Sequence, residues 1–444
     1  MARTTLMATV VCEVCALHAA AQQPQANDAP VHITLAEAIK RAQANEPTFA
    51  AAVAAQKIAG IDGYLAKAAL LPSVAYHNQV LYTQPNGQMN QGGQIGSQAA
   101  PIFIANNAVH EYASQAVINE TVGLKQIADA QAASANAARA AAELEIARRG
   151  LISTVVGLYY SAASAQEKAA IQDEALSEAR AFAEMTQKRE AAREAAHADV
   201  VKAELQTQQK QRDFEDAKVA ADKARLELGV LLFADPRTAY DTDASSALSP
   251  LPARAEVDAL ASKSNPEIRS ALAGMNAANA GVKSAKAGYV PDLGLNFTYG
   301  IDAPQFAKRG PDSVNNLGYS MSATVDVPVW DWFSTQKKIK QSEIQRNVAK
   351  VNLTAAQRRL IASLDESYAE AAAAHNQLAL LDVSVSTAQE SLRLTKLRYT
   401  AGESTALEVV DAQNSFLAAR TAKADGLVRF ENAMAALQVL TGSL

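Results

Sequence analysis

The stretch LRYTAGESTALEVVDAQNSFLAAR, Leu397 to Arg420, lies between two long alanine-rich segments and predicts a helix that breaks and restarts at once. A glycine just past a periodic segment can adopt the left-handed conformation that ends a helix, and we assign this role to Gly402. Ser404 or Thr405 can then accept a hydrogen bond from the first amides of the next helix. The stretch is therefore predicted to be the tip of a helical hairpin.

Two carboxylates lie one turn apart at the start of the second helix, Glu408 and Asp411. Acidic residues in a first turn complement the positive end of the helix dipole, and this effect alone would account for them. On local evidence they are helix caps.

The same pattern occurs twice along the chain. Shifted by 219 positions, Pro47 falls on Pro266 and Pro72 falls on Pro291. A shift of 209 positions aligns a further set of identical residues: Tyr159 with Tyr368, Asp173 with Asp382, Arg189 with Arg398, Glu194 with Glu403, and Val200 and Val201 with Val409 and Val410. Self-similarity at a fixed offset indicates a duplicated structural unit. We predict a first repeat over 33–235, a linker or equatorial segment over 236–254, and a second repeat over 255–444.

Each repeat contains a helix, two strands and two very long helices. The segment PDLGLNFTYGI alternates apolar and polar residues, as does YSMSATVDV, and PSVAYHNQVLY and EYASQAVINE are weaker versions in the first repeat. No proline interrupts 125–190 or 335–398, so each range can form a helix of about 65 residues, or about 100 Å. Helices of that length need packing partners throughout, and their many alanines allow close approach, as in a coiled coil.

The N-terminus has the pattern of a secretory signal peptide over residues 1–21, with a positive charge at Arg3, an apolar run and small residues before the cut. Both cysteines of the sequence, Cys12 and Cys15, lie inside this segment. The mature chain is therefore predicted to have no disulfide and no cysteine metal site.

Composition excludes several classes of function. The net charge of −5 gives no basic surface for a nucleic acid partner. The histidines are scattered, and no grouping of nucleophile, base and orienting residue recurs, so we predict no metal site, no cofactor and no catalytic residue. After residue 21 no run of 18 residues is both predominantly apolar and free of charge, so we expect no membrane-spanning helix.

The motif Y-x-x-G-x-x-T-x-L-x-V-V-D-A at Tyr399–Ala412, the doubled order of elements and the strand ending VDVPVWDW together resemble the TolC-type outer membrane factors. The resemblance covers about Ile33 to Leu444. It implies a mainly helical fold with a small β part, in which three copies each add four strands to one twelve-stranded barrel in outer membrane lipid. A coiled-coil α-helical barrel would continue this channel into the periplasm.

The resemblance also implies a function. Members of this family are passive exit ducts of tripartite efflux pumps and type I secretion systems, and they are not enzymes. A periplasmic adaptor protein and an inner-membrane transporter would open the duct at its periplasmic tip. The same resemblance gives a cell outer membrane location.

Site residues follow from the family motif. Tyr399 matches a tyrosine that bonds to an aspartate of the other hairpin to hold the periplasmic end closed, and Asp199 matches that aspartate. Glu408 and Asp411 match carboxylates that line the narrowest ring. Tyr399 as a simple core aromatic remains open, as does the cap role of the two carboxylates. In the first-repeat tip, Arg193 stands where a glycine is usual.

The two tryptophans of the chain, Trp330 and Trp332, come at the end of the last strand segment. Tryptophan is enriched at membrane interfaces, so we predict that these two residues belong to an aromatic girdle.

Two other classes of protein use long helical hairpins, a periplasmic coiled-coil adaptor and a soluble scaffold. An adaptor has a single hairpin between β-rich halves, so two hairpins with amphipathic strands disfavour it. A scaffold would be released from membranes by salt, whereas a barrel needs detergent.

Overall fold

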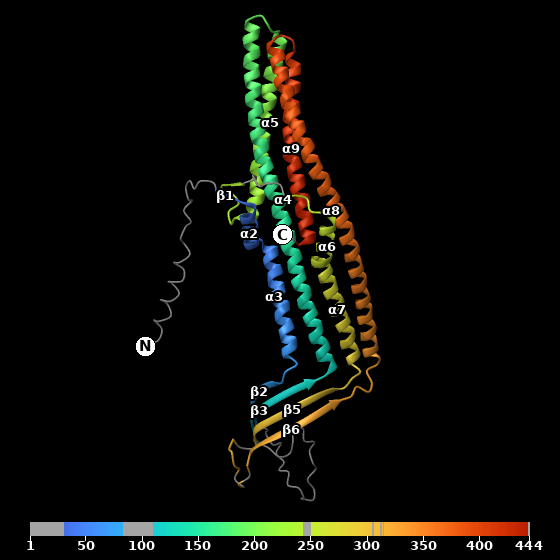
Figure 1. Ribbon diagram of the computed structural model, residues 1–444. Helices are drawn as coiled ribbons and strands as arrows, with labels where there is room; N and C mark the ends of the chain where they lie inside the picture. The colour runs from blue at the N-terminus through green and yellow to red at the C-terminus, as the bar shows by residue number, and fades with distance from the viewer. Residues whose placement is uncertain are drawn as a thin grey trace, which may run out of the picture. The chain divides into compact units, whose positions relative to one another are not determined.

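The computed structural model describes residues 31–82, 110–242, 250–303, 306–310, 313 and 315–442. The predicted signal peptide, 1–21, lies outside these residues, as do residues 243–249 of the predicted linker. The described chain is mainly helical with one small sheet, as the sequence predicts, and it also contains one pair of short strands (Figure 1).

The order of elements is the same in both halves of the chain. The first half contains β1 (Val31–Ile33), α2 (Leu35–Asn45), α3 (Pro47–Ala68), β2 (Ser73–Tyr82), β3 (His110–Val122), α4 (Leu124–Ala191) and α5 (His197–Leu232). The second half contains β4 (Tyr240–Thr242), α6 (Arg254–Ser264), α7 (Pro266–Ala287), β5 (Asp292–Ala303), β6 (Leu317–Asp326), α8 (Ser334–Thr400) and α9 (Ala406–Thr441). The helices have 11, 22, 68 and 36 residues in the first half and 11, 22, 67 and 36 in the second. The two very long helices are confirmed.

One tyrosine hydrogen bond also occurs in both halves. The Tyr159 hydroxyl donates to the Ile33 carbonyl at 2.9 Å, and the Tyr368 hydroxyl donates to the Pro252 carbonyl at 3.3 Å. The tyrosines are related by the shift of 209 positions and their acceptors by the shift of 219. Each bond ties a long helix to the segment that precedes the short helices of the same half.

The short helices begin at the prolines that the repeat aligns. Proline is favoured in the first turn because its fixed φ suits a helix and its missing N–H would be unpaired there. The residue before each proline is the N-cap: Glu46 accepts a hydrogen bond from the Thr48 amide, and Asn265 accepts one from the Ile268 amide at 2.9 Å. Local sequence therefore sets where α3 and α7 start.

The described chain divides into two compact units. The first takes the described residues of Met1–Ala42, Leu158–Ser249 and Gln389–Ala424, and the second takes those of Gln43–Gly157, Pro250–Ala388 and Asp425–Leu444. Each unit therefore combines segments from both predicted repeats. The first unit also contains a parallel pair of three-residue strands, β1 and β4.

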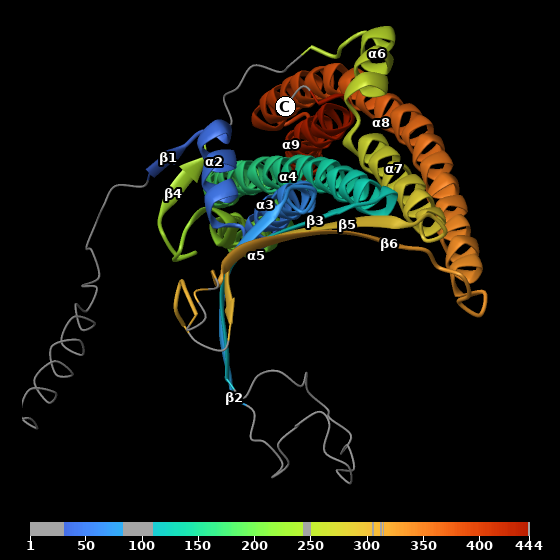
Figure 2. The same ribbon diagram turned by 90° about the horizontal axis from the view of Figure 1, so that it is seen from below.

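The second unit contains an antiparallel sheet in the order β2-β3-β5-β6. Its strands are the four that the sequence predicts, and Figure 2 shows β5 and β6 curving along their length. Each half of the chain contributes one outer strand and one inner strand, β2 and β3 from the first half and β6 and β5 from the second, so the two halves meet at the β3–β5 pairing. The strands β2 and β6 are the outer ones.

The register gives this sheet one apolar face and one polar face. Directly opposed residues point to the same side of an antiparallel sheet. One face carries an apolar row from each strand, with members Val74, Tyr76, Ile118, Leu293, Phe297, Tyr299, Tyr319, Met321 and Val325. The other face carries asparagine, glutamine, serine, threonine and glycine, and there Asn296 donates to the Asn119 side chain at 2.6 Å. Most of the apolar row is exposed in the single chain, including Tyr319 at 77% and Met321 at 74%.

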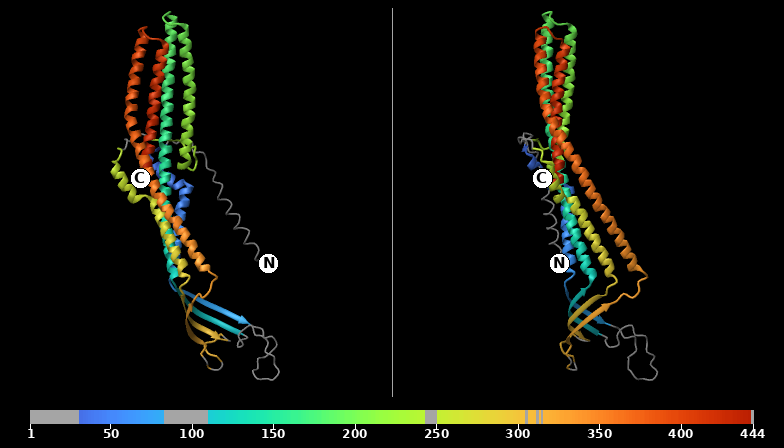
Figure 3. Two further views of the ribbon diagram at one scale, coloured as in Figure 1. Left: turned by 90° about the vertical axis from the view of Figure 1, so that its right-hand side faces the viewer. Right: turned by 45° about the vertical axis from the view of Figure 1, so that its right-hand side comes forward.

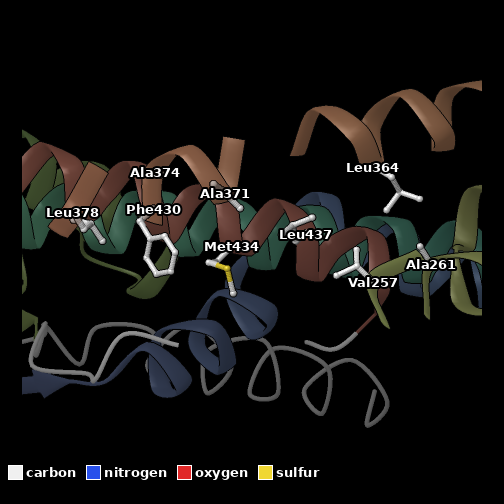
Figure 4. Close-up of a cluster of buried hydrophobic side chains, with 10 residues drawn as sticks. Val257, Ala261, Leu364, Ala371, Ala374, Leu378, Phe430, Met434 and Leu437 are labelled. Carbon is white, nitrogen blue, oxygen red and sulfur yellow. The ribbon is translucent and has the colours of Figure 1, made fainter. Parts of the chain in front are cut away.

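A hydrophobic core in the second unit joins α6, α8 and α9 (Figure 4). Phe430 is fully buried at its centre, between Leu378 on one side and Leu437 further along α9. The remaining buried members are mostly small: Val257, Ala261, Leu364, Ala371, Ala374, Ala433 and Met434. Alanines at the contact positions let the helix axes approach closely. None of the helices in the described ranges has a stretch that is both long enough and apolar enough to cross a bilayer.

Two paired glycines of the sheet allow a test of the β3–β5 contact. Gly300 lies opposite Gly318, but a methyl group added at Gly300 would lie 2.2 Å from the Ser114 carbonyl oxygen, whereas one at Gly318 would meet nothing within 4 Å. We expect Gly300→Ala to lower the free energy of unfolding by about 2 kcal/mol or more, because backbone must shift. Gly318→Ala should change it by less than about 0.5 kcal/mol. Thermal unfolding followed by circular dichroism measures both, and equal effects would contradict the close approach at Gly300.

Candidate functional site

The candidate site is the end of the first unit where both long helices turn back. One turn joins α4 to α5 and the other joins α8 to α9, and the views in Figures 1 and 3 place the two turns side by side. We call residues 182–206 hairpin 1 and residues 391–415 hairpin 2. The shift of 209 positions maps hairpin 1 onto hairpin 2.

Both helices end in the same hydrogen-bonded motif. In each turn one amide bonds to the carbonyl three residues back and the next bonds to the carbonyl five residues back: Arg193 to Glu190 and Glu194 to Arg189 in hairpin 1, and Gly402 to Tyr399 and Glu403 to Arg398 in hairpin 2. This pair of bonds requires a left-handed residue just after the helix. Gly402 has φ 81° and Arg193 has φ 64°. An L-residue with a side chain therefore occupies the strained position of hairpin 1.

The α9 helix begins with a capping box. The Glu408 amide donates to the Thr405 hydroxyl at 3.3 Å, and the Thr405 amide donates to the Glu408 carboxylate at 3.3 Å. The Ser404 hydroxyl also donates to this carboxylate, at 3.0 Å. Such reciprocal bonds satisfy amides that the helix itself leaves unpaired.

These bonds affect the titration of Glu408. Hydrogen bonds from the Thr405 amide and the Ser404 and Thr405 hydroxyls, with the Arg398 guanidinium at 3.8 Å, hold the pKa of Glu408 below its ordinary value. Because its pKa is lowered in the folded state, the ionised Glu408 carboxylate stabilises the cap at pH values above its unfolded-state pKa. That stabilisation is lost as the pH falls through the folded-state value.

The first tip lacks this cap. The N-cap of α5 is Ala196, which has no side chain able to bond, and Asp199 occupies the position that corresponds to Glu408. Asp411 lies one turn further into α9 and is exposed. In the described ranges neither the Asp199 carboxylate nor the Asp411 carboxylate accepts a hydrogen bond or forms an ion pair. The two predicted ring carboxylates therefore differ, because Glu408 is bonded within its own turn and Asp411 is not.

Tyr399 is buried between the hairpins. Its ring centroid lies 5.2 Å from that of Phe182, and its hydroxyl donates to the Thr186 hydroxyl at 3.4 Å. It belongs to an apolar cluster that also contains Ala183, Ala203, Ala406, Val409 and Val410. Within the part of the chain that the structure describes, no hydrogen bond joins Tyr399 to Asp199. The bond between them stays a prediction, and Thr186 is the partner that the sequence did not indicate.

Arg189 ties the two tips together. Its guanidinium lies over the Tyr399 ring at 4.8 Å and donates to the Tyr399 carbonyl. Its Nε lies 3.7 Å from the Glu194 carboxylate, which is too far for a hydrogen bond. A cation at a helix C-terminus and over an aromatic ring is favourable on both counts. The sequence contained one signal for this role, because Arg189 aligns with Arg398 at the same place in hairpin 2.

Further polar contacts hold the hairpins together away from the tips. The Gln206 amide donates to the Asn414 side chain at 3.1 Å, and Lys396 pairs with Glu178 at 3.1 Å. These contacts and the apolar cluster make the two hairpins one packed body near their tips.

The predicted girdle residues lie in the second unit, after the end of β6. Trp330 and Trp332 pack edge to face with ring centroids 5.7 Å apart, and they are 63% and 82% exposed. Trp332 and Phe333 both have left-handed backbone conformations, with φ 55° and 63°. The Thr335 amide donates to Asp331 at 2.7 Å, which helps to start α8. Two large aromatic rings are thereby presented to the surroundings.

Among the residues that the structure describes, no group of three or more His, Cys, Asp or Glu side chains is arranged to hold a metal ion.

The fold of the described chain is shared with solved outer membrane channels. The described chain is similar to the outer membrane protein VceC of Vibrio cholerae, with a TM-score of 0.77 and 18% identity over 92% of this chain and 96% of that one. It is also similar to the CmeC outer membrane channel of Campylobacter jejuni, with a TM-score of 0.76 and 15% identity over 92% of this chain and 85% of that one. At these identities the likeness establishes the fold.

The family follows from the second half of the chain. Residues 259–443 match the model of the outer membrane efflux protein family. The outer membrane efflux protein BepC of Brucella suis biovar 1 (strain 1330) is 27% identical over 184 residues, which are 41% of this chain and 39% of BepC. The match therefore spans about two fifths of that relative. The resemblance to TolC-type outer membrane factors is confirmed.

Substitutions at the left-handed positions test the geometry of the tips. A residue with a side chain destabilises the fold by about 1–2 kcal/mol when it adopts the left-handed conformation. Glycine avoids this strain, but its greater conformational freedom in the unfolded chain offsets about 0.5–1 kcal/mol of the gain. We therefore expect Arg193→Gly to stabilise the hairpin 1 tip by about 0.5–1 kcal/mol and Gly402→Ala to destabilise the other tip by a similar amount. Amide hydrogen exchange at each turn measures both.

Arg193→Ala is the control, because it removes the charge and keeps the backbone strain. Its tip should exchange at nearly the wild-type rate. If alanine stabilised the tip as much as glycine, charge and not conformation would be the cause.

Proposed function

We propose that this protein is the outer membrane exit duct of a tripartite efflux pump or a type I secretion system. It is a passive channel and not an enzyme. The observation that carries the proposal is the four-stranded sheet, which has one exposed apolar face and two open edges and is joined to long helical hairpins. The family match and the outer membrane location of the similar channels support the same reading.

The open edges are the reason to propose an oligomer. Unpaired backbone groups in lipid cost several kcal/mol each, so a sheet in a bilayer must close on itself. Four strands cannot close, but the antiparallel order lets β6 of one copy pair with β2 of the next. Three copies would make the twelve-stranded barrel of the family. The apolar face, with Phe297, Tyr319 and Met321, would then contact lipid, and the polar face would line the channel.

The two sequence repeats, 33–235 and 255–444, would supply alternate parts of this assembly. Each repeat contributes two strands and one pair of long helices, so three chains would present six similar hairpins around one axis. The linker 236–254 would join the repeats at the level of the β1–β4 pair. Matching helix lengths in the two halves support this arrangement.

An aromatic girdle is the role we propose for Trp330 and Trp332. Indole rings favour the boundary between lipid and water, and both rings are exposed beside the end of β6.

The partners proposed are a periplasmic adaptor protein and an inner-membrane transporter. A passive duct needs an energised protein to supply cargo, and both the family description and the name of BepC refer to efflux. These partners would act at the hairpin tips, since the opposite end of each long helix leads into the sheet.

The gate would consist of the contacts around Tyr399. We propose that Tyr399 and Asp199 hold the hairpins of a closed duct together. Burial of Tyr399 between the hairpins and the position of Asp199 in the first turn of α5 support this pairing. In the single chain the hydroxyl is bonded to Thr186, 13 residues before Asp199, so the gate bond would need the Tyr399 ring or α5 to move.

Glu408 and Asp411 would form the acidic constriction of the trimer. Threefold symmetry would turn the two positions into six carboxylates around one axis, and like charges held close together recruit cations. The exposed, unpaired Asp411 is the better supported member, because Glu408 also serves as a cap.

The function can be tested with protein extracted from membranes. We expect detergent to be required for extraction, a mass of three chains in detergent, and ion conduction in planar bilayers. Tyr399→Phe should raise the closed-state conductance while the trimer persists, because it removes the hydroxyl that fixes the ring. A scaffold or an adaptor would instead wash off with salt and would not conduct.

The ring can be tested with single substitutions of its two carboxylates. We expect Asp411→Asn to weaken the cation preference and the block by a trivalent ion, since it removes three of the six charges from the axis. Glu408→Gln should disturb the α9 cap more than the selectivity. Reversal potentials across a salt gradient measure the preference for both variants and for the double variant. If the double variant kept both preference and block, the two residues would be caps only.

A further inference from the structure

One arginine of α4 holds the ends of two other helices. The Arg149 guanidinium donates to the Val439 carbonyl at 2.8 Å, near the end of α9, and to the Ser264 carbonyl at 3.1 Å, at the end of α6. Its Nε donates to Glu145 at 2.7 Å. The last carbonyls of a helix have no partner within that helix, and a cation there also complements the negative end of the dipole. Arg149 is 4% exposed, so these bonds belong to the interior of the second unit.

Arg149 is part of a covered face of α4. Four residues spaced by three or four positions lie on this side of the helix, and we call them the Arg149 face: Ala142, Glu145, Arg149 and Ile152. Ala142 is 1% exposed and Ile152 is 3% exposed. The arginine bonds are therefore flanked by apolar packing on both sides.

The corresponding face of α8 is uncovered. The shift of 209 positions maps the Arg149 face onto Val351, Thr354, Arg358 and Ile361, which we call the Arg358 face. Val351 is 66% exposed and Ile361 is 64% exposed. Arg358 is exposed too, and among the described residues it has no hydrogen-bond or ion-pair partner. The face that packs in α4 is thus repeated in α8 without a contact in the described chain.

The end of α5 is the counterpart of the surface that Arg149 contacts on α9. Val439 corresponds to Val230, and Ala435 corresponds to Leu226. Ala435 is 2% exposed, whereas Leu226 is 38% exposed and Val230 is 61% exposed. Across the described ranges no amide and no side chain donates to the Val230 carbonyl, and the last turn of α5 has no basic residue. The end of α5 therefore offers an apolar surface and a carbonyl acceptor.

A face of one kind and a different surface that fits it can form a closed ring when copies are related by rotation. We propose that the Arg358 face of one copy docks on the end of α5 in a second copy of this chain. Arg358 would donate to the Val230 carbonyl of that copy, as Arg149 donates to Val439 within one chain. The inference rests on the proposed trimer and specifies a contact at the end of α5 that is opposite to its hairpin turn.

A carboxylate on α5 makes an arginine the fitting residue to dock there. Glu227 precedes Val230 by three residues, so the two lie on the same side of α5. Glu227 is exposed and forms no ion pair in the part of the chain that the structure describes. The equivalent residue of α9 is Ala436, which carries no charge. The end of α5 thus adds an ionic acceptor that the end of α9 does not have, and arginine bonds to carboxylate are strong.

The two arginines would differ in the source of their carboxylate. Arg149 pairs with Glu145 of its own helix, four residues earlier. In α8 that position is Thr354, so Arg358 would take its carboxylate from Glu227 of the next copy. This exchange moves the ion pair from within one helix to the contact between two chains. Because salt screens charges that are partly exposed, the contact between chains should weaken as salt rises.

The direct test is crosslinking between the two positions. In the double variant Arg358→Cys with Val230→Cys, a short bismaleimide added to native membranes should give species of two and three chains on a denaturing gel. A reagent with some reach is needed because the arginine side chain would hold the two backbones further apart than a disulfide spans. Each single-cysteine variant should stay at the mass of one chain.

Two further pairs control for chance collisions and for reactivity. Arg358→Cys with Lys218→Cys moves the second cysteine by about three turns along α5, and it should not link chains. Asp129→Cys with Ser284→Cys should react without increase in mass, because these residues are bonded within one chain at 2.6 Å.

A charge exchange keeps the test decisive if the cysteines impair folding. Arg358→Glu alone and Glu227→Arg alone should each speed dissociation of the trimer several-fold at a fixed temperature and low salt, and the double exchange should return the rate to near the wild-type value. Arg359→Glu is the matched control, because it reverses a neighbouring charge outside the Arg358 face and should change the rate little. Gels run under conditions that preserve the trimer follow the dissociation.

The outcomes separate this inference from the proposed function. A wild-type trimer whose 230–358 pair links no chains and whose double exchange gives no rescue would overturn the inference and leave the proposed duct intact. A link from position 358 to a different protein would also overturn it. A wild-type protein that is a single chain in detergent would overturn both.

Discussion

The open edges of the four-stranded sheet are the constraint on which the rest of the structure depends. Within the described ranges, backbone groups of β2 and β6 have partners on one side only, and the sheet has an apolar face that the described chain leaves exposed. Neither problem can be solved within one chain. The duplicated helices follow the same arrangement as the strands, because each half of the chain supplies two strands and the pair of helices that continues them. In the proposed trimer, association would solve both problems, and the fold of one chain would be a segment of a larger closed object.

The tips extend this logic from the backbone to the side chains. Hairpin 1 and hairpin 2 descend from one pattern, yet Arg189 has a buried aromatic partner and Arg398 does not. Divergence between copies of a repeat lets one set of contacts be permanent and the other reversible. The proposed duct would need both kinds, since its chains would have to separate at the tip while its barrel stayed closed.

Local rules explain what the sequence predicted. Alternation in 292–303 identified β5 and its apolar face, the prolines marked the starts of α3 and α7, and Gly402 marked a turn, because each depends on a few neighbouring residues. The hydrogen-bond partner of Tyr399 and the contact of Arg189 with the Tyr399 ring depend on side-chain packing between residues more than 200 positions apart, which no local pattern encodes. The β1–β4 pair was not predicted because three residues are too few to show a period. The sequence indicated only part of the capping box at Thr405 and Glu408, namely the acidic residue in the first turn.

The left-handed arginine at the hairpin 1 tip has a consequence for whatever docks there. Gly402 leaves its turn without a side chain, whereas Arg193 adds a cation at the corresponding place. In the proposed trimer six similar turns would then alternate between charged and bare. A partner that contacted only the shared backbone would have six equivalent binding sites, but one that recognised the guanidinium would have three. That one residue would set the stoichiometry of docking and fix its rotational register, so that an adaptor ring could seat in three orientations and not in six.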